Sequence, residues 1–382
     1  MISEELFQYV VSVRRQIHRR PELGFDLPET VALVKKELSA MGIPFTEEFS
    51  PGSVVGFIGN DPEKKTLAIR ADMDALPVEE KVDLPFKSEI PGRMHACGHD
   101  THTAILLGVA KELKKREKEL ACNVRLFFQP SEECEVSGAK VMTENGAMEG
   151  VDAIICTHCD TVLKTGEVGA FSGWYMAACM PFVIRFHGKT THATSPKDGV
   201  DAIRMAHEAY AVLDKAAPEE AGQERFIWSV GVVRGGTAHN VVSDLCEMVA
   251  TFRYFDPAFA KRWTARVEKE CGAIAQKYGG TVEVIAEVSS NAVYNDPALS
   301  ARFRELAERD PDLKLADVEM RMGSEDFNWY LAKAPGFLFR YGIRNEKEGC
   351  GLYSGHNNCF KVDENGMKYA VTAFIDFATD FS

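Results

Sequence analysis

The chain has 382 residues, of which 45% are hydrophobic and 26% are charged, so it has the composition of a globular protein. Its length exceeds the roughly 250–300 residues that one hydrophobic core usually serves, which favours two domains. The 44 basic and 57 acidic residues give a formal net charge of −13. A field of this sign repels phosphate backbones, so nucleic acid is excluded as an expected partner.

The amino-terminal segment does not resemble a targeting sequence. Glu4 and Glu5 stand where a signal peptide carries positive charge, and no window offers the roughly 18 apolar residues of a membrane helix. The ten cysteines are scattered rather than arranged as a dense disulfide framework, and in a chain of this size they indicate thiols of a reducing compartment. We therefore expect a cytoplasmic protein that has no membrane partner.

The first third of the chain alternates helical and strand-like segments. Helical periodicity covers about 3–20 and 28–41, buried strands are predicted at 66–76 and 123–133, and an amphipathic helix at 104–120 lies between these strands. This alternation predicts an α/β sheet, in which functional residues gather at the carboxyl ends of strands. Polar residues that follow apolar strand-like runs are Asp72, Asp74, Glu132, Glu133 and His158.

The middle of the chain has a different pattern. Strands are predicted at 181–188 and 225–236, a strand pair or one long strand at 240–255, and a further strand at 281–289, with helices at 201–217 and 258–280. The order β-α-β-β-α-β is that of a ferredoxin-like α+β domain. We expect this domain at 178–293, inserted in a larger α/β domain of residues 1–177 and 294–382 whose mixed sheet is flanked by helices.

Residues 92–103 (GRMHACGHDTHT) contain a set of metal-ligand types. Cys97 and His99 lie two residues apart, just before the predicted helix, beside His95, Asp100 and His102. Thiolate, imidazole and carboxylate are the ligands of zinc-class or manganese-class cations, and an extended segment or turn lets residues i and i+2 face one site. The alternative is a polar loop whose histidines only form hydrogen bonds.

Adjacent carboxylates end the second predicted strand. Glu132 and Glu133 side by side are costly unless a cation lies near them. A hydrolase that uses metal-activated water needs one carboxylate ligand and one carboxylate base, and two neighbours at a strand end can divide these roles. The alternative is a solvated acidic turn.

Two further histidines extend the set. His158 follows an apolar run and lies between Cys156 and Cys159. This C-x-x-C could serve a structural zinc ribbon, but no second pair stands at suitable spacing; a redox dithiol and a His158 metal ligand are the other interpretations. His356 lies in a Gly- and Asn-rich loop. A lone histidine in such a loop more often forms hydrogen bonds than binds metal, so His356 is a candidate ligand only in combination with the other residues.

Nine segments, taken in order, resemble one family. The chain is similar, from about residue 13 to its last helix, to the aminoacylase and carboxypeptidase G group of co-catalytic metallohydrolases. The similarity favours the amidohydrolase branch, with its hippurate hydrolases, auxin-conjugate hydrolases and N-acetyldiaminopimelate deacetylases. The segments are RRQIHRRPELGFDLPET, RADMDALPVEE, GRMHACGHDTHT, QPSEE, HGKTTHATSPKDGVDAI, GGTAHNVV, ATFRYF, MGSEDF and GHNNCFKVDE.

The resemblance implies a role for each matching residue. Cys97 resembles the ligand between two metal ions, and the other implied ligands are His99, Glu133, His158 and His356. Glu132 resembles the general base. Asp74 resembles the carboxylate that orients the site, with Asp72 as a second. In the inserted domain, His192 resembles the histidine that reaches the scissile carbonyl, and the implied substrate-binding residues are Asn240 and Arg253.

The function implied is metal-dependent hydrolysis of the amide bond of an N-acyl amino acid or a short peptide. Two divalent ions are expected in each subunit: manganese or zinc, with cobalt and nickel as further options. The inserted domain is expected to act as a lid and to form a homodimer. One alternative is a catalytically silent relative that only binds a peptide or a metal. Another is a two-metal phosphoesterase, but no phosphate-binding element lies near the predicted ligands.

Overall fold

The computed structural model describes residues 1–382, and contacts within the chain divide it into two units. The first unit is made of Met1–Gly173, Tyr294–Glu319 and Asp326–Ser382, and the second of Trp174–Val293 and Met320–Glu325. The short strands β7 (Gly173–Met176) and β14 (Val293–Asn295) contain two of the points at which the chain passes between units. None of the helices combines the length and the apolar character that a membrane span requires.

An eight-stranded mixed sheet forms the middle of the first unit, as expected from the sequence. Four neighbouring strands, β4, β3, β5 and β16, run parallel to one another, and antiparallel pairs lie on both sides of them. Parallel strands covered on both faces form near-continuous hydrophobic runs, and every residue of β3 is buried, including Arg70 and Asp72. In sheet order the strands are β1 (Phe45–Thr46), β2 (Val54–Ile58), β4 (Asn123–Gln129), β3 (Thr66–Asp72), β5 (Ala153–Lys164), β16 (Gly336–Arg344), β6 (Glu167–Ala170) and β15 (Lys314–Leu315).

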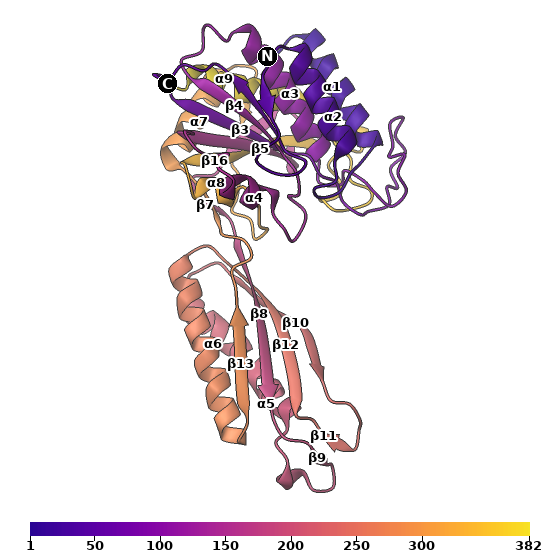
Figure 1. The fold of residues 1–382 in the computed structure, drawn as a ribbon, viewed down its shortest axis with the longest axis vertical. Helices are drawn as coiled ribbons and strands as arrows, with labels where there is room; N and C mark the ends of the chain where they lie inside the picture. Colours follow the sequence, from indigo (N-terminus) through magenta and orange to yellow (C-terminus); the bar gives the residue numbers. More distant parts are fainter. The chain divides into compact units, whose positions relative to one another are not determined.

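Helices flank this sheet. The close pair formed by α1 and α3 (Figure 1) depends on Gly108, because a Cβ at that position would lie 2.5 Å from Cγ2 of Val10. The long helix α3 is buried along most of its length and packs against α9 as well. The helices of the first unit are α1 (Glu4–Arg19), α2 (Pro28–Ala40), α3 (His99–Lys115), α4 (Gly138–Glu144), α7 (Pro297–Arg309), α8 (Asn328–Leu331), α9 (Gly366–Asp380) and the 3-10 turn η2 (Glu346–Glu348).

The start of α3 differs from the sequence prediction. The helix begins at His99, five residues before the predicted start, so His99 lies in its first turn. Gly98 precedes it in the left-handed region, with φ of 94°. Glycine adopts this conformation without the steric cost that a side chain would add. The sharp turn at Gly98 is what separates Cys97, before the helix, from His99, within it.

The second unit contains a four-stranded antiparallel sheet with the spatial order β10-β12-β8-β13. Along the chain its elements follow the order β-α-β-β-α-β, and α5 and α6 pack against each other and against strands of this sheet (Figure 1). The elements are β8 (Ala178–His187), β9 (Thr191–His192), η1 (Pro196–Asp198), α5 (Ala202–Ala221), β10 (Ile227–Gly235), β11 (Val241–Val242), β12 (Leu245–Tyr254), α6 (Pro257–Tyr278) and β13 (Thr281–Ala286).

A buried arginine joins the parallel strands of the first unit at their carboxyl ends. Arg70 of β3 donates to Oδ2 of Asp72 at 2.6 Å, to Oε1 of Gln129 at 2.8 Å and to Oδ1 of Asp326 at 2.8 Å. The side chains of Arg70 and Asp72 are each 1% exposed. Breaking a buried ion pair by removing one partner is strongly destabilising, because the other charge is left without compensation.

We predict that Arg70→Met lowers the free energy of unfolding by about 3–5 kcal/mol, because Asp72 and Asp326 would lose their buried counter-charge. Urea denaturation followed by circular dichroism would measure the change. Arg302→Met is the matched control: it removes an exposed arginine that pairs with Glu305 and Asp380, and it should leave the urea midpoint close to that of the wild type. Equal midpoints for the two variants would contradict the prediction.

Candidate metal centre

The carboxyl ends of the parallel strands carry polar side chains at one edge of the first unit's sheet. Asp72, the last residue of β3, pairs in register with Gln129 of β4, and His158 of β5 pairs with Arg340 of β16. In open α/β sheets, ligands bind outside this edge of the strands. We therefore expect the predicted ligands to come together at this edge.

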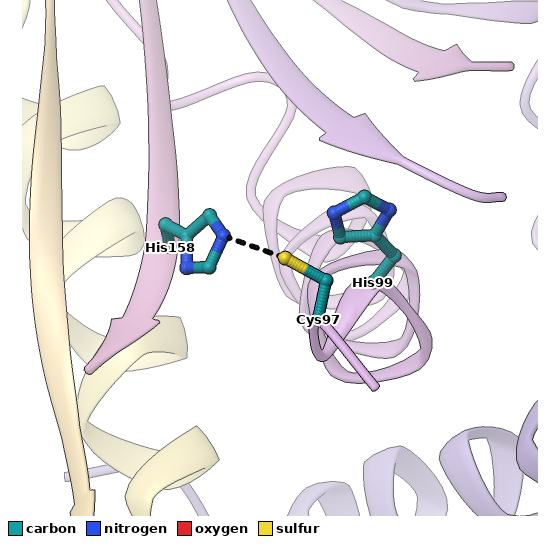
Figure 2. Close-up of side chains that lie close together, drawn as sticks. All are labelled: Cys97, His99 and His158. Carbon is teal, nitrogen blue, oxygen red and sulfur yellow. Dashed lines mark hydrogen bonds between the residues drawn. The ribbon is translucent and has the colours of Figure 1, made fainter. Parts of the chain in front are cut away.

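Cys97, His99 and His158 do come together. One ligand atom from each lies within 4.8 Å of the other two. The Cys97 sulfur is 3.3 Å from Nε2 of His158, and Figure 2 shows it between the two imidazole rings. Nδ1 of His99 donates to the carbonyl of Asp74, and Nδ1 of His158 donates to the carbonyl of Cys159, each at 2.8 Å. Both rings therefore keep Nε2 for the centre of the site.

The other two predicted ligands, Glu133 and His356, also lie close to the Cys97 sulfur. Cys97, Glu133 and His356 also offer ligand atoms within 4.8 Å of one another, and Oε1 of Glu133 is 3.1 Å from Nε2 of His356. The backbone of His356 has a φ of 67° and donates its N–H to the carbonyl of Ala96 at 2.8 Å. The residue before Cys97 thus holds His356, and the other four predicted ligands each place a ligand atom within 4.8 Å of the Cys97 sulfur.

Asp74 holds the pair of glutamates by their backbone. Its two carboxylate oxygens accept hydrogen bonds from the N–H groups of Glu132 and Glu133, at 3.0 and 3.1 Å. These bonds fix the turn that follows β4, where Ser131 has a φ of 55°. Both glutamate side chains are therefore directed to His99, whose Nε2 is 3.9 Å from Glu132 and 3.8 Å from Glu133.

The centre of the cluster fits a divalent cation. Nε2 of His99 is buried and makes no hydrogen bond, although carboxylate oxygens of Asp72, Glu132 and Glu133 surround it at 3.8–3.9 Å. Three carboxylates facing one imidazole nitrogen repel one another unless a positive charge lies among them. The nitrogen, sulfur and oxygen donors match those that bind zinc and similar metals in proteins.

The pKa values of the ligand side chains reflect this crowding. Burial and then the charge on Glu133 raise the pKa of the Cys97 thiol well above its ordinary value. Burial opposes protonation of His99, but the Asp72 carboxylate outweighs it and raises the His99 pKa well above its ordinary value. Burial, followed by the charge on Arg340, lowers the pKa of His158 well below its ordinary value. Without a metal, protons on Cys97 and His99 offset the surrounding negative charge.

The C-x-x-C around His158 does not act as a pair of thiols. Cys156 and Cys159 both lie in β5, where residues three apart point to opposite faces of the sheet. Both thiols are free and buried, and burial raises the pKa of Cys159 to about 12. This geometry argues against a redox dithiol and against a zinc ribbon.

The three remaining predicted site residues belong to the second unit. His192 of β9 pairs in register with Val241 of β11, and the carbonyl of Asn240 accepts a hydrogen bond from Ala193 at 2.9 Å, so His192 and Asn240 are neighbours. Arg253 lies toward the end of β12 and donates to the hydroxyl of Ser324. The ligand cluster of the first unit does not include these residues.

Several buried residues around the cluster were missed in the sequence. His102, which the sequence placed only beside the ligands, donates from Nδ1 to Asp72 at 2.6 Å. Arg70, Gln129 and Asp326 complete the network behind Asp72. One signal was available: Arg70 and Asp72 are two apart in a strand and so share a face. The partner Asp326 is too distant along the chain for any local pattern to reveal it.

Several known proteins are similar to this chain over most of its length. The chain is 37% identical to thermostable carboxypeptidase 1 of Saccharolobus solfataricus, over 99% of this chain and 96% of that protein. It is 33% identical to N-acetyl-L-cysteine deacetylase of Bacillus subtilis, over 95% and 85% of the two chains. The crystal structure of Bacillus subtilis YxeP, described as a dinuclear metal binding peptidase, superposes with a TM-score of 0.88 at 30% identity, over 99% and 98% of the chains.

The model of peptidase family M20/M25/M40 matches residues 68–380. Family membership confirms the expected enzyme class, a metal-dependent peptidase or amidohydrolase, and the resemblance found in the sequence. The chain belongs to peptidase family M20/M25/M40.

Proposed function

We propose that this enzyme cleaves the amide bond of N-acyl amino acids or short peptides at a centre of two divalent ions. The observation that carries the proposal is the position of the Cys97 sulfur. It belongs both to the group with His99 and His158 and to the group with Glu133 and His356. A sulfur shared by two groups is what a ligand between two ions requires. The dinuclear description of YxeP supports the same number of ions.

The protein residues would divide the chemistry as follows. Divalent ions bound in the centre would lower the pKa of water to about 7 and polarise the substrate carbonyl. Glu132 takes a proton from the attacking water and delivers it to the leaving amine nitrogen. Asp74 keeps the Glu132 carboxylate in place through the backbone bonds to Glu132 and Glu133. The thiolate of Cys97 favours zinc, while the carboxylates also suit manganese; cobalt and nickel accept the same donors.

Glu132→Gln should retain the bound metal and lower kcat by about 10²–10⁴-fold, because an amide cannot accept the proton of the attacking water. Metal content by mass spectrometry and turnover of N-acetyl amino acids would be measured together. Glu135→Gln, an exposed position three residues further along the same turn, is the control and should retain turnover. Unchanged kcat in Glu132→Gln would contradict its role as the base, and a wild type that binds metal without turnover would favour the catalytically silent alternative.

Metal binding should release protons and weaken as pH falls. The raised pKa values of Cys97 and His99 leave both groups protonated near neutral pH in the metal-free protein, and both must lose a proton to bind metal. Calorimetric zinc titrations in buffers of different ionisation enthalpy count these protons. Cys97→Asp should release about one proton fewer, because an aspartate is already ionised. Cys359→Ser is the control, and an unchanged proton count in Cys97→Asp would contradict the prediction.

Arg253 and Asn240 are the proposed substrate-binding residues. The planar guanidinium of Arg253 suits a substrate carboxylate, which would favour substrates with a free carboxyl group next to the cleaved bond. The carboxypeptidase and deacetylase relatives act, by their names, on peptides and on an N-acetyl amino acid. Ten free cysteines fit a reducing compartment, and we propose a cytoplasmic location.

We propose further that residues 178–293 form an inserted ferredoxin-like domain and that 1–177 with 294–382 form the catalytic domain. The element order β-α-β-β-α-β and the strand order β10-β12-β8-β13 support the first assignment. The division of the chain into two units supports the assignment of the catalytic domain. The segment Met320–Glu325 clusters with the unit that contains the inserted domain. In this proposal the inserted domain acts as a lid and as the dimer contact.

A homodimer through the inserted domain is supported by the surface of the second unit. β10 is an edge strand, and an exposed edge invites pairing with another chain. Apolar side chains stay exposed along it and on the neighbouring helix α5: Ile227, Val233, Ile203 and Tyr210 are 39–57% exposed. His192 lies exposed in the same unit, where it could serve the site of a second subunit.

Subunit mixing tests both the dimer and the role of His192. Glu132→Gln and His192→Ala should each inactivate the enzyme, since one removes the base and the other the group that stabilises the oxyanion. When the two variants are coexpressed and form dimers at random, about a quarter of the wild-type activity should return, because half of the dimers contain one complete site. A monomer in size-exclusion chromatography, or no recovery of activity, would contradict this arrangement.

A further inference from the structure

His102 is a buried residue beside the metal centre, with no place in the mechanism described so far. It lies in α3, three residues after His99, and is 1% exposed. Its ring is close to two of the proposed ligands: the ring centroids are 4.7 Å from His158 and 5.5 Å from His99. Its position suggests a ligand at first sight, but its hydrogen bonds exclude that role.

Both ring nitrogens of His102 are already used by protein groups. Nε2 is 3.1 Å from the backbone nitrogen of Cys159, and because a backbone N–H can only donate, Nε2 is an acceptor. The ring proton is therefore on Nδ1, which donates to Oδ1 of Asp72 at 2.6 Å. Asp72 is in turn fixed by Arg70 at 2.6 Å. His102 thus has one defined tautomer and one defined orientation.

His102 binds the backbone of Cys159, and Cys159 in turn positions His158. The carbonyl of Cys159 accepts the Nδ1–H of His158 at 2.8 Å, which sets the tautomer of the ligand ring. The thiol of Cys159 donates to the carbonyl of Cys97 at 3.2 Å. Cys159 therefore links the backbone of Cys97 to the side chain of His158. His102 in turn accepts the N–H of Cys159.

We propose that His102 is a positioning residue: through Cys159 it keeps His158 in the orientation that binds metal beside Cys97. This inference rests on the proposed function, since it assumes that His158 is a ligand. Hydrogen-bond partners that orient metal-binding histidines commonly contribute 10–100-fold to metal affinity. A merely structural role for His102 would instead change the stability of the metal-free protein without a specific effect on metal binding.

Replacement by asparagine keeps one of the two hydrogen bonds of His102 and removes the other. In His102→Asn the amide nitrogen takes the place of Nδ1 and can still donate to Asp72, but no atom reaches the N–H of Cys159. In calorimetric titrations with zinc alone, His102→Asn should weaken binding at one of the two sites by about 10–100-fold. His102→Gln should stay within about threefold of the wild type, because its amide keeps a donor and an acceptor one carbon apart, as in imidazole.

The matched control is Thr103→Val. Thr103 is the next residue of α3, is equally buried, and donates to the carbonyl of Asp72 at 2.8 Å. Its loss removes one buried hydrogen bond from the same turn without affecting Cys159. Thr103→Val should lower the urea midpoint as much as His102→Asn does and leave zinc affinity unchanged. Equal loss of affinity in both variants would overturn the proposal in favour of a structural role.

A double-mutant cycle with His158 gives the decisive comparison. His158→Ala removes the proposed ligand itself, and in that background His102→Asn should weaken zinc binding by less than about threefold, because the group it positions is gone. The same 10–100-fold loss in both backgrounds would overturn the proposal, as would an unchanged affinity in His102→Asn alone. If His102→Asn does not fold, His102→Phe takes its place in the same cycle. A wild-type protein that binds no zinc would contradict the proposed function instead.

Discussion

The compensation of buried negative charge is the constraint on which the first unit depends. Asp72, Asp74, Glu132 and Glu133 converge at the carboxyl ends of β3 and β4, where their side chains are at most 12% exposed. Arg70 neutralises Asp72 through its Oδ2. The same oxygen lies 3.8 Å from Nε2 of His99, around which the donors of the candidate metal centre meet. In the metal-free protein, the raised pKa of His99 supplies part of the positive charge that these carboxylates require.

The sequence predicted which segments meet at the candidate site better than it predicted the strand ends. β3 and β4 end four residues before the predicted ends, at Asp72 and Gln129, and β5 continues through His158 to Lys164. Apolar runs followed by acidic residues or histidine pointed to Asp72, Glu132 and His158, and the structure brings the other four predicted ligands close to the Cys97 sulfur. The start of α3 was wrong, because the polar residues that open the helix carry no apolar periodicity. Those polar side chains are buried by tertiary contacts, which a local pattern does not contain.

The network behind the ligands was less accessible to sequence reasoning. His102 stood in the same motif as His99, and nothing in the spacing distinguishes a ligand from a residue whose two nitrogens are already bonded. The segment Met320–Glu325 posed a similar problem: it joins the second unit through bonds from the N–H of Ala177 to the carbonyls of Arg321 and Gly323. Both cases depend on partners distant along the chain, which only the folded structure brings together.

The place of β16 in the sheet has a consequence for synthesis of the protein. This strand begins at Gly336, yet it lies between β5 and β6, which the ribosome completes far earlier. Until β16 emerges, β5 of the nascent chain has an unpaired edge that includes His158, and such edges promote aggregation. The elements from β8 to β13 precede β16 along the chain and are complete before it emerges. The sheet of the first unit is thus completed only after all residues of the second unit have been synthesised.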